Sequence, residues 1–116
     1  MSNRTRSDEV DDLFERALPV MHSTLESYYR MTNREAREAE QDIYVWFHRF
    51  ARRSGHTETP VRSLRHSLLL GACQYGRAFQ LWKHGGEDLD DNLGRVLARE
   101  PQELASELAA RLDREG

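Results

Sequence analysis

Apolar residues recur at steps of three and four along most of this chain, which is the repeat of an α-helix rather than of a β-strand. The clearest stripe consists of Ala36, Ala39, Ile43, Phe47 and Phe50. Alternation with a period of two never lasts more than a few residues, and no Asn-Gly or Asp-Gly pair marks a hairpin. At 116 residues the chain has the length of one domain. We therefore predict an all-α fold, a small helical bundle of three core helices plus a short acidic C-terminal helical segment.

The first predicted helix begins after Ser7, whose hydroxyl suits an N-cap. Pro19 is expected to kink or restart this helix, because proline lacks the backbone N–H and its ring collides with the preceding turn. The apolar side chains on both sides of the proline form one stripe: Val10, Leu13, Phe14, Ala17, Leu18, Met21, Leu25, Tyr28 and Tyr29. The sequence thus predicts an amphipathic helical segment that is interrupted near its middle.

The second predicted helix has the form of a capping box at its start, with Thr32 as the cap and Glu35 three residues later. We expect it to run to about Arg53. Three consecutive side chains widen its apolar surface beyond the single stripe: Tyr44, Val45 and Trp46. Either deep burial or an adhesive outer face would explain this excess.

The third predicted helix follows a loop over residues 54–62, is capped by Ser63 and runs to about Lys83. Its apolar face consists of Leu64, Leu68, Ala72, Tyr75, Phe79 and Trp82. Gly71 and Gly76 lie inside it, at a cost of about 1 kcal/mol each relative to alanine. Glycines in such places indicate close helix packing or the approach of a partner.

The end of the chain is acidic and carries leucines at helical spacing. The pair Gly85 and Gly86 is expected to end the third helix, and Pro101 to open the last one. Two short helices are predicted, the first with Leu89, Leu93, Val96 and Leu97, the second with Leu104, Leu108 and Leu112. We therefore divide the chain into a helical domain, residues 8–84, and an acidic helical linker or tail, residues 85–116.

The net charge of −3 is divided unevenly along the chain. Residues 1–29 contain three basic and six acidic side chains, residues 30–84 contain ten and five, and residues 85–116 contain four and nine. A basic middle segment between acidic ends is typical of a protein whose middle segment binds a polyanion, such as nucleic acid. An ordinary solvated surface is the alternative.

Several classes of function are not supported by the sequence. There is one cysteine, Cys73, so an internal disulfide is impossible, and its apolar neighbours predict a buried small side chain. No two of the histidines that we considered as metal ligands (His48, His56, His66 and His84) are four residues apart, and no phosphate-binding loop or serine elbow occurs. The carboxylates of Glu38, Glu40 and Asp42 are expected to be solvated. We predict no enzyme activity, no cofactor and no metal.

The longest apolar run, residues 68–73, is far shorter than the roughly 20 residues of a membrane span. The charged residues 1–12 lack the apolar stretch of a signal peptide. We therefore expect a cytoplasmic protein that does not interact with membranes.

The middle of the chain resembles a known family. Residues 36–50 read AREAEQDIYVWFHRF, which is similar to the helix A-E-D-L-V-Q-E-V-F-L-R-A-W-R of bacterial sigma factors. Residues 63–77 read SLRHSLLLGACQYGR, which resembles the S-F-R-A-W-L-x-x-I-A-R-N helix of the same family. The best match is region 2 of sigma factors of the extracytoplasmic-function type, and it covers residues 10–83. The domain over residues 8–84 is accordingly interpreted as a sigma region-2-like helical domain.

The resemblance implies two kinds of site. Core RNA polymerase would be bound, at the clamp helices of its beta-prime subunit, by Glu38, Gln41, Asp42, Val45, Trp46 and Arg49. The minus-ten element of promoter DNA, with one base flipped out, would be contacted by Arg52, Arg53, Arg62, Arg65, Gln74 and Arg77. An anti-sigma factor is a further implied partner. Without the resemblance, Trp46 would be read as a core residue and the arginines as a solvated face.

The chain departs from the family pattern at positions that matter for promoter recognition. The family's core tryptophan is replaced by Ser67, its asparagine by Gln74 and its later aspartate by Ala78. Nothing after Gly85 resembles region 4, which reads the minus-thirty-five element. These departures favour an alternative, a helical protein-interaction or adaptor domain that has lost promoter recognition. A third possibility is a homodimeric bundle formed through the C-terminal leucines.

Overall fold

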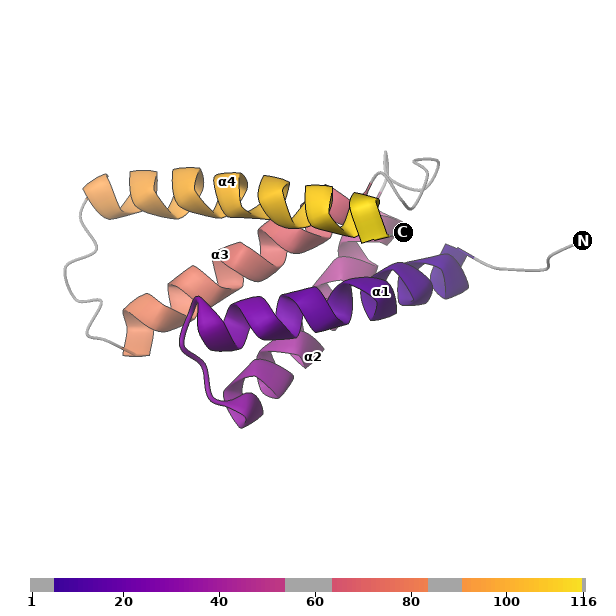
Figure 1. Ribbon diagram of the computed structural model, residues 1–116, viewed down its shortest axis with the longest axis horizontal. Coiled ribbons are helices and arrows are strands. Elements are labelled where there is room, and N and C mark those ends of the chain that lie inside the picture. Colours follow the sequence, from indigo (N-terminus) through magenta and orange to yellow (C-terminus); the bar gives the residue numbers. More distant parts are fainter. Residues whose placement is uncertain (1–5, 54–63, 84–90, 116) are drawn as a thin grey trace, which may run out of the picture.

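The structure is a computed structural model that describes residues 6–53, 64–83 and 91–115, with side chains described for 7–53, 64–83 and 100–114. It contains α1 (Arg6–Ser27), α2 (Asn33–Arg52), α3 (Arg65–Lys83) and α4 (Asp91–Glu115). Each of these helices runs antiparallel to the one before it, and no strand occurs in the described residues (Figure 1). The predicted all-α bundle is confirmed.

The first helix is continuous through Pro19, so of the two predicted outcomes, a kink or a restart, the restart does not occur. Pro19 is exposed, whereas Val20, Met21 and Leu25 after it are buried. Burying side chains of this size stabilises the helix by about 1.5–3 kcal/mol each, which offsets the roughly 3 kcal/mol cost of an interior proline. The predicted cap is also wrong, because α1 begins at Arg6, one residue before Ser7.

The second helix begins as predicted. The Glu35 backbone N–H donates to the Thr32 hydroxyl at 3.1 Å, and the Thr32 N–H donates to the Glu35 carboxylate at 2.9 Å. Both bonds of the capping box are thus present, and α2 ends at Arg52, close to the predicted end at Arg53.

The third helix packs against all three others and lies at the centre of the bundle. Its two glycines explain how. A Cβ on Gly71 would collide with the Trp46 ring of α2, and a Cβ on Gly76 would collide with the Tyr29 ring at the end of α1. The predicted close packing at both glycines is confirmed. The apolar face is shorter than predicted, because Trp82 is 76% exposed.

The last helix is single, so the prediction of two short C-terminal helices is wrong. Pro101 lies inside α4 and is buried, together with Ala105, Leu108 and Leu112. Ala105, Leu108 and Leu112 belong to the same hydrophobic core as the buried side chains of the other helices, because α4 packs along α3. Ser63, the Gly85–Gly86 pair and Leu89 lie outside the described residues, and the side chains of Leu93, Val96 and Leu97 are not described.

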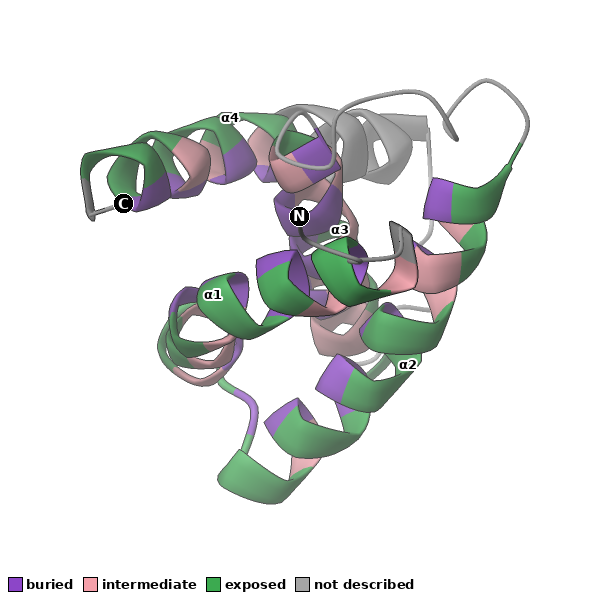
Figure 2. Ribbon diagram, turned by 90° about the vertical axis from the view of Figure 1, so that its right-hand side faces the viewer, coloured by how far each residue is buried: buried purple, intermediate pink, exposed green. Residues whose placement is uncertain are grey.

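One hydrophobic core joins the four helices, whose buried faces point towards the middle of the molecule (Figure 2). Tyr29 and Phe47 are its largest fully buried side chains. Tyr28, predicted to join the same stripe, is instead 46% exposed. No helix in the described part of the chain is both long enough and apolar enough to cross a membrane.

Candidate docking surface and groove

A row of exposed side chains runs along the outer face of α2, and we call it the α2 stripe. It consists of Glu38, Gln41, Asp42, Val45 and Arg49. These positions recur at the three- and four-residue steps of a helix, as do the buried positions on the opposite face of α2. The local sequence pattern therefore fixes which face points outwards. Val45 is 48% exposed, so the stripe has an apolar side chain among its charged and polar ones.

Trp46, which the resemblance assigned to the same surface, is only partly exposed. Its ring stacks on Phe50 with centroids 5.3 Å apart and lies against Gly71 of α3. Trp46 therefore packs between helices, as the alternative interpretation of the sequence had it.

The α2 stripe is held to α3 through one of its members. The Tyr75 hydroxyl on α3 donates to the Asp42 carboxylate at 2.7 Å. Burial, together with this hydrogen bond, raises the pKa of Tyr75 to about 12, so the hydroxyl remains a donor at neutral pH. Glu35 at the start of α2 also pairs with Lys83 at the end of α3, 2.8 Å away. These contacts fix the stripe relative to the rest of the bundle.

The described residues among those implied as promoter contacts lie on or next to two helices and differ in exposure. Arg52 and Arg53 are exposed at the end of α2, and Gln74 is exposed on α3. Arg62 lies outside the described residues. Arg65 and Arg77 are twelve positions apart on α3, or about 18 Å along a helix.

Two of these cations are paired with carboxylates of α4. Arg77 Nε donates to Glu100 at 2.6 Å, and its guanidinium lies 5.4 Å from the centre of the Tyr29 ring. Arg65, at the other end of α3, pairs with Asp113. The sequence analysis missed these pairs because α4 was expected to be a tail. The acidic C-terminal helix thus neutralises the two most buried of the described arginines in the implied DNA site.

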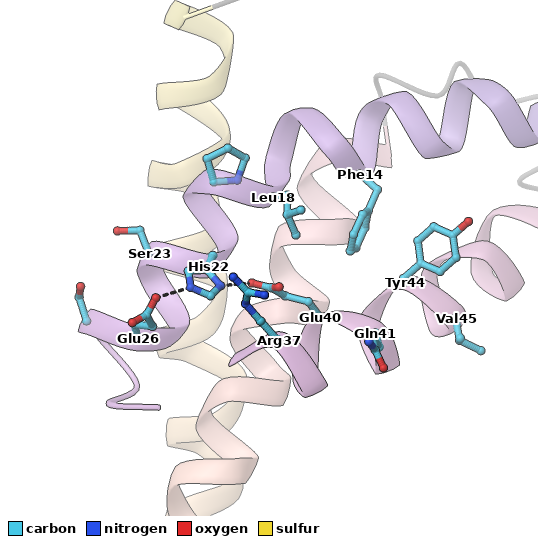
Figure 3. Close-up of a pocket in the computed structure, with 12 residues that line it drawn as sticks. Phe14, Leu18, His22, Ser23, Glu26, Arg37, Glu40, Gln41, Tyr44 and Val45 are labelled. Atoms are coloured by element: carbon cyan, nitrogen blue, oxygen red, sulfur yellow. Dashed lines mark hydrogen bonds and ion pairs between the residues drawn. The ribbon is translucent and has the colours of Figure 1, made fainter. Parts of the chain in front are cut away.

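A groove of about 870 Å³ lies between α1 and α2 (Figure 3). Its apolar part is lined by Phe14 and Leu18 from α1 and by Tyr44 and Val45 from α2. The opposite end is polar and is lined by His22, Glu26, Arg37 and Glu40. Gln41 and Val45 belong both to this groove and to the α2 stripe, so the two features form one continuous surface.

The polar end centres on the His22 cluster, which consists of His22, Glu26 and Glu40. His22 Nδ1 lies 2.5 Å from a Glu40 oxygen, and its Nε2 faces Glu26, as the dashed lines in Figure 3 mark. Burial lowers the pKa of His22, but the hydrogen bond and charge of Glu40, with the charge of Glu26, outweigh it, so the pKa is raised. Protonated His22 can donate to both carboxylates.

Sequence reasoning missed this cluster. Glu40 was expected to be solvated, but it is buried, because α1 covers it and His22 is its partner. One local signal could have indicated part of the site, namely the spacing of four residues between His22 and Glu26 on one helix face. Glu40 could not have been added, since it is 18 residues away on another helix.

We call the contact between α1 and α2 the seam. At the end of the seam away from His22, Asp11 of α1 accepts hydrogen bonds from the Tyr44 hydroxyl and from His48 Nε2, each at 2.7 Å. The bonds from Tyr44 and His48 lower the pKa of Asp11. Tyr44, which lines the groove, is thereby held in place.

Comparison with protein-family models, curated proteins and solved structures finds no match to this chain. Among the described residues, no group of three or more His, Cys, Asp or Glu side chains is arranged so that it could hold a metal ion. Cys73 is buried, as predicted, and burial raises the pKa of its thiol to about 12, so it is not a reactive thiolate at neutral pH. In the described part of the chain, the candidate binding features are therefore the exposed side chains of the α2 stripe and the adjoining groove.

Proposed function

We propose that this chain is a docking module that binds core RNA polymerase through the α2 stripe, in the manner implied by its resemblance to region 2 of sigma factors. The observation that carries the proposal is the exposure of Gln41, Val45 and Arg49 in one row on α2. This helix is tied to α3 near its start through Glu35 and to α1 nearer its end through His48. An exposed apolar side chain surrounded by polar ones is typical of a protein interface.

A second observation bears on promoter DNA. Phosphate binding requires cations that can exchange their counterions for phosphates. Arg65 and Arg77 already have carboxylate partners on α4. This favours the adaptor alternative, in which the module binds its protein partner and has lost promoter recognition. Of the described arginines implied as promoter contacts, Arg52 and Arg53 remain exposed, and two cations by themselves would give weak DNA binding.

The test compares binding of the full chain and of a double variant, Gln41→Ala with Val45→Ala, to immobilised core RNA polymerase. Interface hot spots cost at least about 2 kcal/mol when truncated, so we expect the double variant to bind at least tenfold more weakly. The matched control is Glu107→Ala with Arg111→Ala, two exposed positions on α4, which should change affinity less than twofold. Absence of binding by the unmodified chain, or equal binding by both variants, would contradict the proposal.

The two forms of the proposal are distinguished by measuring the binding of a single-stranded minus-ten oligonucleotide at about 50 mM and about 200 mM salt. The adaptor form predicts polymerase binding without salt-sensitive binding of the oligonucleotide. Salt-sensitive binding that is lost in Arg52→Glu with Arg53→Glu would instead support the initiation-factor form.

A further inference from the structure

The His22 cluster is an unusual feature of the groove, because it places a buried carboxylate beside an apolar lining. Glu40 is buried, and a buried carboxylate is stable only with a partner that satisfies its charge. The charged groups that act on His22 are Glu26 from its own helix and Glu40 from α2, and the Asn33 side chain of α2 also contacts it. Arg37 of α2 lines the same end of the groove.

The charge balance of this end depends on His22. When the imidazole is protonated, it and Arg37 balance the two carboxylates. When the imidazole is neutral, the four groups have a net charge of −1. A further cation would then restore the balance by taking the place of the proton on His22.

The remainder of the groove suits a helix. It is open to solvent, and on α1 it extends from Phe14 to Ser27, which is about 20 Å at a rise of 1.5 Å per residue. Phe14, Leu18 and Val45 form its apolar lining. A helix that lies in such a groove contacts it with apolar side chains at steps of three and four. About 13 residues of helix would cover it.

We propose that the groove binds an amphipathic helix of a partner protein, and that an arginine or lysine of this helix pairs with Glu26 and Glu40 in place of protonated His22. The inference deepens the proposed function, since the groove shares Gln41 and Val45 with the α2 stripe, but it requires no particular partner. The occupant is basic because the groove has more carboxylates than permanent cations and because residues 1–29 have a net charge of −3.

Binding and protonation then oppose each other. Because the pKa of His22 is raised, the imidazolium is retained to a higher pH than usual. When the partner's cation enters, either His22 releases its proton or the imidazolium is displaced from the two carboxylates. The affinity of the groove for a basic helix should therefore increase as the pH rises from about 6 to about 8.

The probe is a pair of stapled helical peptides of about 14 residues with one leucine stripe, identical except that one has arginine and the other citrulline at the end of the stripe. Citrulline has the shape of arginine without its charge. Binding to the isotope-labelled full chain is followed by NMR at pH 6 and pH 8. We expect shifts at Leu18 and Gln41, and an affinity for the arginine peptide at pH 8 at least about tenfold above that for the citrulline peptide.

Glu40→Gln should remove the preference for arginine while the apolar contacts remain. Since Glu40 is buried, Glu26→Gln, at a more exposed position, provides a second variant that should reduce the preference if the first does not fold. Equal affinities for the two peptides, shifts outside the groove, or tighter binding at pH 6 than at pH 8 would each overturn the inference. If the chain does not bind polymerase but still prefers the arginine peptide, the proposed function is overturned and this inference stands.

Discussion

The helix pairs on the two sides of this bundle are joined in different ways. The buried contacts around α3 are close and apolar, with Leu68 and Leu69 fully buried and glycines that let the aromatic rings of Trp46 and Tyr29 approach the backbone. Between α1 and α2 the outer side of the seam contains the groove. Polar contacts cross the seam in two places, between Asp11 and Tyr44 and between His22 and Glu40.

The difference indicates where stability and recognition reside. A closely packed region has no room for a partner, whereas an open groove with a titratable centre can receive one. The arginines on α3 also lie on the closed side, where α4 carboxylates neutralise them. Recognition is therefore expected on the α1 and α2 side of the molecule.

The largest expected effect is on the free energy of unfolding, when a leucine is replaced by alanine in each of the two regions. Leu68→Ala should lower the free energy of unfolding by about 3 kcal/mol, because it leaves a cavity in the closely packed region around α3. Leu18→Ala should lower it by only about 1 kcal/mol, since Leu18 is partly buried and lines the open groove. Urea denaturation followed by circular dichroism measures both. Equal losses would remove the distinction between the regions.

An intermediate effect is expected from the two arginines paired with α4. Arg77→Met should cost about 2 kcal/mol, because it leaves the largely buried Glu100 carboxylate without its cation. Arg65→Met should cost less than about 1 kcal/mol, because its partner Asp113 is 68% exposed and can be hydrated. Adding Glu100→Gln to Arg77→Met should restore part of the loss in the same denaturation experiment. If the double variant is no more stable than Arg77→Met, the loss comes from packing rather than from an uncompensated charge.

The smallest expected effect is the pH dependence of the stability that His22 contributes at the seam. Because the pKa of His22 is raised on folding, its protonated form stabilises the fold at low pH, and this contribution is lost as the pH rises through the folded-state value. The stability advantage of the unmodified chain over His22→Gln should therefore fall by about 0.5–1 kcal/mol between pH 6 and pH 8.

His66→Gln is the control for this pH experiment, since His66 is exposed and its described contact is the Ser106 hydroxyl, 3.2 Å away. An advantage over His22→Gln that grows with pH would show that His22 is neutral in the folded protein.

Local features of the sequence predicted local features of the fold. The bonds of the capping box depend on two residues three positions apart, and the α2 stripe follows from the repeat of a single helix. The prolines were misjudged for the same reason. Local rules describe what Pro19 and Pro101 cost, but not the core contacts of the surrounding residues that keep α1 and α4 continuous.

The sequence by itself determined that this chain is helical, where α2 and α3 extend, and which face of α2 points outwards, because the periods and caps that decide these features act over a few residues. Only the tertiary structure decided that α4 would neutralise Arg65 and Arg77, that Trp46 would pack against Gly71, and that His22 would meet Glu40. Each of these contacts joins residues 18 or more positions apart, so it depends on how whole helices pack.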